Sequence, residues 1–268
     1  MIDAPVPGAA AWQPPPGFRV VAYDTVGSTN DIAKDLARSG SPERTVVWAR
    51  RQTAGRGRRG RAWESAAGNL YLSTVLRPAV PVTVAAQISF VAALAIADLA
   101  ATLLPASAAV RCKWPNDVLV NGRKLAGILL ETEAAADGTV AWLVLGTGIN
   151  LTEAPPGAEY PATTLAAAGA DHPVPETAGP MFLGALDGWL ERWTAAGFAA
   201  VRTAWLERAA GVGGPVAVRL ADRTLHGTFV DLDDDGVLLL DCGDGAGVRR
   251  VAAGDVFFPG VPPATGGV

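Results

Sequence analysis

The pattern of apolar and polar positions divides the chain into a long first part and a short second part. In the first part, short runs of alternating or continuous apolar residues predict β-strands, and apolar residues at helical spacing predict helices. The predicted strands are residues 18–26, 45–49, 70–76, 110–113, 118–120, 125–131 and 139–145. The predicted helices are residues 31–39, 82–104, 176–195 and 198–210, the last two anchored in the core by Trp189, Trp193 and Trp205.

Two turns organise the middle of the chain. Asn121-Gly122 favours a type I′ hairpin turn, because both turn positions need positive φ, and Asp137-Gly138 is a second sequence of the same kind. The two turns connect three consecutive predicted strands into an antiparallel meander, which ends at residues 146–150, GTGIN.

The second part of the chain has a different pattern. After the glycine-rich residues 211–215, the sequence up to Phe258 consists of short strand patterns separated by turn signals, which predicts a small all-β barrel. We therefore expect a disordered N-terminal segment at 1–16, a main domain at 17–210, and a barrel with a short tail at 211–268. The class of the fold is α+β.

Composition and charge narrow the possible functions. The 268 residues carry a net charge of −4, which argues against binding nucleic acid along the whole surface. The N-terminus has no basic region followed by an apolar run, so we expect a cytoplasmic protein. Residues 82–104 are as long as a membrane span, but Gln87 and Asp98 interrupt them, and we interpret them as a core helix. Cys112 and Cys242 are too far apart in sequence to suggest a metal site.

A polar junction and a basic loop are the first two candidates for chemistry. Residues 27–30, GSTN, lie between a predicted strand and a predicted helix, where they fit both a plain helix cap and a ligand site. Six arginines fall between Arg50 and Arg61, interleaved with Gly55, Gly57 and Gly60. No apolar helix follows these glycines, so they are not a dinucleotide-binding fingerprint. We expect a loop that is mobile when empty and folds over an anion, although a solvated basic linker fits the composition equally well.

The lysines are the third candidate. The chain has only Lys34, Lys113 and Lys124, against nineteen arginines. Lys113 and Lys124 lie at strand ends in the meander, where a compact ammonium can face a carboxylate or phosphate. Hairpin geometry alone favours a simpler interpretation, in which both are edge lysines that keep a sheet soluble.

Taken together, these motifs carry a family resemblance. GSTN at 27–30, QTAGRGRRGRAW at 52–63, KWPNDVLV at 113–120, RKLAGILLE at 123–131 and GTGIN at 146–150 resemble the biotin–protein ligase (BirA) family in identity and order. The resemblance covers residues 18–258. It implies a mixed, mostly antiparallel sheet with helices, like that of class II aminoacyl-tRNA synthetases, followed by an SH3-like barrel. It also implies that the main domain is catalytic.

The resemblance implies a two-step activity. Biotin and MgATP form biotinyl-5′-AMP and pyrophosphate, and biotin then passes to a lysine of a biotin carboxyl carrier domain. ATP and Mg²⁺ are co-substrate and ion, with no tightly bound cofactor, and we expect a monomer or a weak homodimer.

The resemblance also implies the site residues. Lys124 and Arg58 would be catalytic, and Asp117 would hold a metal ion. The residues implied to bind biotin are Ser28, Thr29, Asn30, Gln52, Gly55, Arg56, Gly57, Arg58, Lys124 and Gly127. Those implied to bind ATP or the adenylate are Arg56, Arg58, Arg61, Trp63, Lys113, Asn116 and Asn150. Trp63 would lie against the adenine ring.

Some relatives carry an N-terminal DNA-binding domain and repress biotin synthesis, but only a short Pro/Ala-rich segment precedes GSTN here, so we expect no DNA binding. Two alternatives remain open at this point. The first is a lipoate–protein ligase, which shares the fold and the adenylate strategy. The second is a non-enzymatic nucleic-acid binder with a basic loop, and the acidic total charge counts against it.

Overall fold

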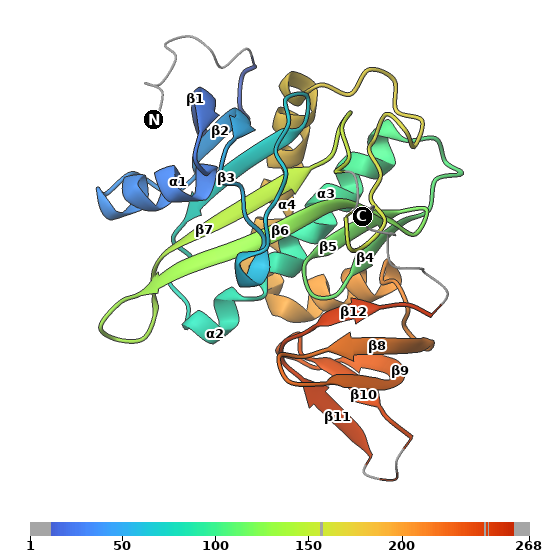
Figure 1. The fold of residues 1–268 in the computed structure, drawn as a ribbon. Coiled ribbons are helices and arrows are strands. Elements are labelled where there is room, and N and C mark those ends of the chain that lie inside the picture. The colour runs from blue at the N-terminus through green and yellow to red at the C-terminus, as the bar shows by residue number, and fades with distance from the viewer. Residues whose placement is uncertain (1–11, 156–157, 244, 246, 260–268) are drawn as a thin grey trace.

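The computed structural model describes residues 12–155, 158–243, 245 and 247–259, and these form two sheets (Figure 1). The larger sheet has seven strands in the order β1-β2-β3-β7-β6-β5-β4. Its strands are β1 (Arg19–Val26), β2 (Thr45–Gln52), β3 (Leu70–Leu76), β4 (Val110–Lys113), β5 (Asp117–Val120), β6 (Arg123–Ala134) and β7 (Val140–Ile149). Only the β1–β2 pair is parallel. The expected mixed, mostly antiparallel sheet is therefore confirmed.

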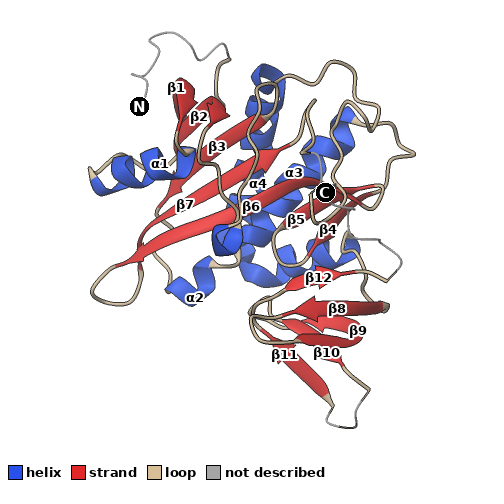
Figure 2. Ribbon diagram, in the orientation of Figure 1, coloured by secondary structure: helices blue, strands red, loops and turns tan. Residues whose placement is uncertain are grey.

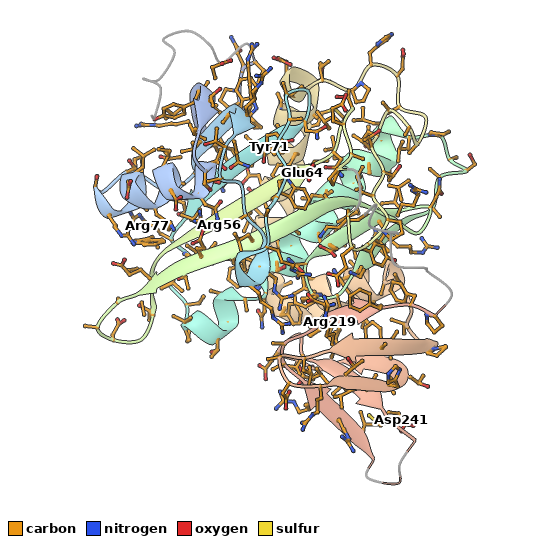
Figure 3. The ribbon with its side chains drawn as sticks, in the orientation of Figure 1. Arg56, Glu64, Tyr71, Arg77, Arg219 and Asp241 are labelled. Atoms are coloured by element: carbon orange, nitrogen blue, oxygen red, sulfur yellow. The ribbon has the colours of Figure 1, made fainter. Side chains whose placement is uncertain are left out.

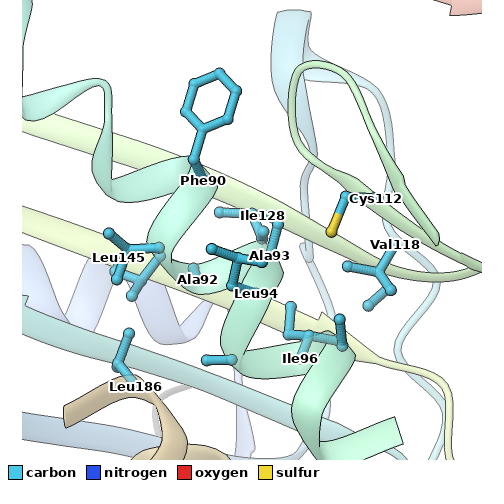
Figure 4. Packing of buried hydrophobic residues seen from close by; sticks show 14 of the residues in the cluster. Phe90, Ala92, Ala93, Leu94, Ile96, Cys112, Val118, Ile128, Leu145 and Leu186 are labelled. Carbon is cyan, nitrogen blue, oxygen red and sulfur yellow. The ribbon is translucent and has the colours of Figure 1, made fainter. Parts of the chain in front are cut away.

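Helices cover both faces of this sheet (Figure 2). On one face, α3 (Ile88–Leu103) and α4 (Pro175–Glu207) enclose the main hydrophobic core. Figure 4 shows α3 side chains such as Leu94 against Ile128 and Leu145 of the sheet. On the other face, α1 (Thr29–Arg38) packs over a smaller apolar cluster. Beyond α1, this second face is hollowed by a cavity where the candidate site lies, and we call it the open face.

The predicted pair of C-terminal helices appears as α4 with a break. Gly197 has φ 70° and ψ −172°, which only glycine adopts at low cost, and it divides α4 into two helical pieces. The three tryptophans predicted as core anchors are buried: Trp189 is 6% exposed, Trp193 is 8% exposed and Trp205 is 0% exposed. Both predictions are confirmed.

One of the two predicted turns has a different geometry. Asn121 and Gly122 have φ values of 51° and 75°, as a type I′ turn requires. At the second turn only Gly138 has positive φ, and its N–H donates to the carbonyl of Ala135. Asp137 instead accepts hydrogen bonds from the N–H and hydroxyl of Thr139. The prediction of a second type I′ turn is therefore wrong, because the carboxylate stabilises a wider turn.

The N-terminal prediction also needs correction. Trp12 is only 6% exposed and packs edge-on against Trp48, with ring centroids 6.0 Å apart. The prediction of a disordered segment at 1–16 is therefore wrong at Trp12, which is packed into the core. Residues 1–11 and the predicted tail at 260–268 lie outside the described residues.

The long apolar segment is part of the core. Val82–Leu103, which includes α2 (Val82–Ala85) and α3, is long and apolar enough to cross a membrane by composition, with a mean hydropathy of 1.9. However, 78% of its most apolar stretch is buried inside the protein, which agrees with the core-helix interpretation.

The second sheet forms the predicted barrel and docks onto the larger domain. Its strand order is β11-β10-β9-β8-β12, and its strands are β8 (Pro215–Arg219), β9 (Thr224–Leu232), β10 (Leu238–Asp241), β11 (Val248–Val251) and β12 (Asp255–Phe257). The turn between β9 and β10 meets the larger domain at Gly236, whose carbonyl accepts a hydrogen bond of 3.1 Å from the indole of Trp114. A Cβ on Gly236 would lie 2.7 Å from the ring of Phe90, so this contact requires glycine. With the barrel docked in this way, β12 lies on the side of the barrel nearest the larger domain (Figure 1).

Candidate functional site

A cavity of about 270 Å³ lies on the open face, between α1, the arginine loop and the barrel. Its floor is hollowed by glycines. Gly127 and Gly148 are cross-strand partners on β6 and β7, and Gly146 follows the same face. A Cβ on Gly146 would come within 2.2 Å of Asn30 Oδ1, so larger residues would fill the space. Of these three, only Gly127 is an expected site residue, although Gly146 and Gly148 lie in the GTGIN motif.

Trp63 lies directly on this glycine floor. A Cβ would come within 2.9 Å of its ring at Gly127 and within 2.7 Å at Gly148. The ammonium of Lys124 lies 5.3 Å from the centroid of the ring, a cation–π distance. The indole N–H is buried without a hydrogen-bond partner. Trp63 is therefore an aromatic wall of the cavity.

Neutral polar groups gather at one end of the cavity. The carbonyl of the Gln52 side chain accepts hydrogen bonds from the backbone N–H and hydroxyl of Thr29, at 2.9 and 3.0 Å. The hydroxyl of Ser73 lies 2.7 Å from Thr29 Oγ1 and 2.5 Å from Asn30 Oδ1. Ser28 lines the same end. The GSTN residues and Gln52 are thus brought together, as predicted, because β1 and β2 are parallel and end side by side.

Two lysines and one carboxylate occupy the opposite end. Asp117 Oδ2 lies 2.9 Å from Lys113 Nζ, and Asp117 Oδ1 lies 2.6 Å from Lys124 Nζ. Burial alone would raise the pKa of the Asp117 carboxyl, but the charges of Lys113 and Lys124 hold it well below its usual range. Lys113 is 5% exposed, and its ammonium lies 4.5 Å from the ring centroid of Tyr160. The interpretation of these lysines as edge residues that keep the sheet soluble is therefore wrong.

Asp117 does not fit the expected role of metal ligand in this arrangement. Both of its oxygens face ammonium groups, and a divalent cation there would be repelled by both lysines. Over the described part of the chain, no group of three His, Cys, Asp or Glu residues could hold a metal ion. Asp117 instead orients Lys113 and Lys124 towards the cavity.

The arginine loop is a tight hairpin over the cavity. Its closing backbone bonds are Trp63 N–H to Gly55 O at 2.9 Å and Gly57 N–H to Arg61 O at 2.7 Å. Gly55 does not line the cavity, contrary to the expectation for it. A Cβ there would come within 2.5 Å of Ser65 Oγ and of the carbonyl of Trp63, so Gly55 allows the loop to fold back.

At its base, the loop is fixed by Arg56. The guanidinium donates to both oxygens of Asp31, at 2.9 and 2.7 Å, and to Glu131 at 2.9 Å. Lys34 contacts the same two carboxylates at 2.9 Å each. The hydrogen bonds from Arg56 lower the pKa of Asp31 to about 2. Arg56 lines the cavity, and Figure 3 shows it between α1 and the sheet, but in this structure its charge is neutralised by protein carboxylates.

The barrel contacts the tip of the loop. Arg58 donates to the carbonyl of Gly254 at 3.1 Å and to Asn116 Oδ1 at 3.4 Å. Arg61 donates to Asp255 at 2.9 Å. The expectation that the loop is mobile when empty stays a prediction, because the structure gives one conformation with the arginines held by protein groups.

Most of the expected site residues line one cavity. Those that line it are Ser28, Thr29, Asn30, Gln52, Arg56, Gly57, Arg58, Arg61, Trp63, Lys113, Asn116, Asp117, Lys124, Gly127 and Asn150. Asn150 is 2% exposed and donates from its side chain to the carbonyl of Thr163 at 3.1 Å. The side-chain amide of Asn116 likewise donates to the carbonyl of Ile128 at 2.6 Å, so both amides hold neighbouring backbone in place.

Sequence reasoning missed several groups that shape the site. They are Ser73, Glu131, Glu159, Tyr160 and Asp255, which lie outside the motifs or, for Glu131, at the end of one. A weak signal existed for Ser73, a polar residue in an otherwise apolar strand. For Asp255 there was none, because only the docking of the barrel places it beside Arg61.

Comparisons with known proteins agree with this geometry. Residues 22–150 match the model of the biotin/lipoate A/B protein ligase family, and residues 212–258 match the biotin protein ligase C-terminal domain. The chain is similar to a biotin--[acetyl-CoA-carboxylase] ligase of Paracoccus denitrificans, at 42% identity over 87% of this chain and 98% of that protein. It is also similar to one of Mycobacterium tuberculosis, at 36% identity over 86% and 85%.

A solved structure gives the same result for the fold. The biotin protein ligase of Aquifex aeolicus in complex with biotin and ATP superposes with a TM-score of 0.73 at 26% identity, over 89% of this chain and 97% of that one. The fold and the site thus define an ATP-dependent carboxylate ligase of the adenylating kind. This chain belongs to the biotin/lipoate A/B protein ligase family and has the C-terminal domain of the biotin protein ligases.

Proposed function

We propose that this protein is a biotin–protein ligase. In the first step, an oxygen of the biotin carboxylate attacks the α-phosphorus of MgATP, and pyrophosphate leaves, giving biotinyl-5′-AMP. In the second step, the amine of an acceptor lysine attacks the carbonyl carbon of this mixed anhydride, and AMP leaves. Mg²⁺ enters with ATP as part of the co-substrate.

The observation that carries the proposal is the division of one cavity into two chemically different ends. One end offers neutral hydrogen-bonding groups from Thr29, Asn30 and Gln52, which suit the ureido ring of biotin. The other end offers Lys113 and Lys124, with arginines above, which suit a carboxylate and a triphosphate. A lipoyl ring has no polar group that would form hydrogen bonds with the neutral end of the cavity.

The proposed roles follow from these positions. Lys124 lies between the glycine floor and Asp117, where its ammonium can stabilise charge that develops on the biotin carboxylate and the α-phosphate. Arg58 reaches the same space from above, and Arg61 and Lys113 add charge for the triphosphate. The outer surface of Trp63 is the place for adenine. Among the described residues that line the cavity there is no Cys or His, which suits direct transfer without a covalent enzyme intermediate.

The acceptor is proposed from chemistry and from the named relatives. A mixed anhydride held inside a cavity is reached by a long, unbranched amine, so we infer a carrier-domain lysine of a carboxylase as the acceptor. The acidic net charge favours this protein partner over DNA. We further propose a cytoplasmic enzyme that acts as a monomer or weak homodimer, which sedimentation at several protein concentrations tests.

Pyrophosphate exchange tests the function. The purified protein is incubated with ATP, Mg²⁺ and labelled pyrophosphate, with biotin, lipoate or no acid added. Label should enter ATP only with biotin. Exchange that depends on lipoate would instead support lipoate–protein ligase, and no acid-dependent exchange would refute adenylation.

A further inference from the structure

Asp255 lies on β12, the edge strand of the barrel, and faces the arginine loop. Its side chain is 10% exposed, and four guanidinium groups surround its carboxylate. The distances are 2.9 Å to Arg61, 3.6 Å to Arg59, 3.6 Å to Arg219 and 3.8 Å to Arg58. Three of the four arginines belong to the loop.

The loop has no counter-charge of its own. Residues 52–63 contain no Asp or Glu, and Arg58, Arg59 and Arg61 lie within four positions of one another. Burial and the neighbouring Arg59 and Arg61 charges lower the pKa of Arg58, while the charge of Asp255 acts in the opposite direction. Arg61 also contacts Glu159 at 3.4 Å, but Asp255 is the carboxylate that lies within 4 Å of all three side chains. Without Asp255, their mutual repulsion would drive the three side chains apart and out towards solvent.

Asp255 is held in a fixed position relative to the larger domain. The β9–β10 turn contacts Phe90 and Trp114, and Arg202 of α4 donates to the carbonyl of Leu232 at 2.8 Å and 2.6 Å. Arg219, the fourth arginine, also forms a bidentate pair with Glu159, so it has another partner besides Asp255. Figure 3 shows Arg219 where the barrel meets the larger domain.

We propose that Asp255 is a positioning residue that holds Arg61 over the cavity. Together with the adjacent carbonyl of Gly254, it also holds Arg58 there, so that the barrel completes the adenylation site. The bound arginines keep an excess of positive charge, because one carboxylate faces three loop guanidiniums. An incoming carboxylate or phosphate therefore still finds unsatisfied donors. The kinetic consequence rests on the proposed function, whereas the loop conformation does not.

Limited proteolysis tests the loop conformation without any substrate. The variants are Asp255→Asn, which removes the charge and keeps the shape, and Asp222→Asn as a matched control. Asp222 lies on the same barrel, 70% exposed, and contacts only the neighbouring Arg223, at 3.8 Å, among the ion pairs of the described residues. Trypsin should cleave after Arg58, Arg59 or Arg61 at least about fivefold faster in Asp255→Asn than in the wild type or the control. Thermal denaturation of each protein establishes that the fold persists at the assay temperature.

A double-mutant cycle tests the positioning role during the reaction. Biotin-dependent pyrophosphate exchange is measured for Asp255→Asn, Arg61→Gln and the double variant. Misplaced loop arginines should lower kcat/KM by about tenfold to a hundredfold in Asp255→Asn. If Asp255 acts through Arg61, the double variant should be no more than about threefold worse than the worse single variant.

The outcomes separate the two proposals. Multiplicative losses in the double variant, or loop cleavage in Asp255→Asn at the wild-type rate, would overturn the positioning role. A wild-type protein without biotin-dependent exchange would refute the proposed function, while the proteolysis result would still decide whether Asp255 holds the loop.

Discussion

Lys124→Ala separates chemistry from folding at this site. The substitution removes an ammonium that lies 2.6 Å from Asp117 Oδ1 and 5.3 Å from the ring centroid of Trp63. Lys113 remains 2.9 Å from the other oxygen of Asp117, so the buried carboxylate keeps one partner. The backbone of β6 is unchanged because the position is part of a paired strand.

The two expected effects differ in size. Loss of a preorganised charge aimed at the developing negative charge costs about 3–4 kcal/mol, or roughly a hundredfold to a thousandfold in rate. Leaving one oxygen of a buried carboxylate without its partner costs about 1–3 kcal/mol of folding free energy. For a chain of this size that is a fall in Tm of roughly 2–10 °C, so the variant should stay folded at 25 °C.

The assay is biotin-dependent pyrophosphate exchange, with Tm measured on the same preparations. Arg123→Ala is the matched control, because Arg123 precedes Lys124 on β6, is exposed, and donates to the carbonyl of Ala162 at 3.0 Å. The control should keep its exchange rate within about threefold of the wild type, since its side chain lies outside the cavity. An exchange rate in Lys124→Ala within a few fold of the control would show that the ammonium does not act on the reacting groups.

Three further outcomes follow from the same contacts. Biotin and ATP together should slow trypsin cleavage in the loop Gly55–Arg61 at least about fivefold, because bound anions add partners for its arginines; equal rates with and without both ligands would contradict this. Arg58→Gly should still make biotinyl-AMP but release it, since the contacts to Gly254 and Asn116 are lost. The released biotinyl-AMP should then label an unrelated lysine-rich protein with biotin. If that protein stays unlabelled while the variant still makes biotinyl-AMP, Arg58 does not retain the intermediate. Asp31 has a pKa lowered from 3.8 to about 2, so its stabilising contribution is present above about pH 4 and is lost as the pH falls towards 2. The Tm difference between wild type and Asp31→Asn should therefore be constant from pH 5 to 7 and shrink below pH 4. A Tm difference that does not change with pH would contradict the lowered pKa.

Much of the local structure could be predicted from sequence. The type I′ turn at Asn121-Gly122, the seven strands and the two-piece C-terminal helix follow from residue spacing, because periodicity and turn preferences act over a few neighbouring residues. Where a single side chain competes with the expected turn, as Asp137 does through Thr139, spacing alone gave the wrong geometry. Trp12 shows the same limit, because a Pro/Ala-rich context hides a residue that covers Trp48.

The site shows a similar division. The motifs contain most of the residues that line the cavity, yet hairpin geometry favoured the wrong interpretation of Lys113 and Lys124. The carboxylate between them, Asp117, is four positions from Lys113, but it is 7% exposed in a cavity most of whose other lining residues are distant in sequence. Burial is a property of the whole fold, and it is what turns a strand-end lysine into a catalytic candidate.

The sequence by itself determined which chemical groups the protein has, and the order of the elements that carry them. Only the tertiary structure decided which charges face one another. Arg61 and Asp255 are 194 positions apart, and Arg56 and Glu131 are 75 apart. No local pattern encodes such pairs, because an ion pair depends on distance in space, and that distance is set by how the sheet, the loop and the barrel pack together.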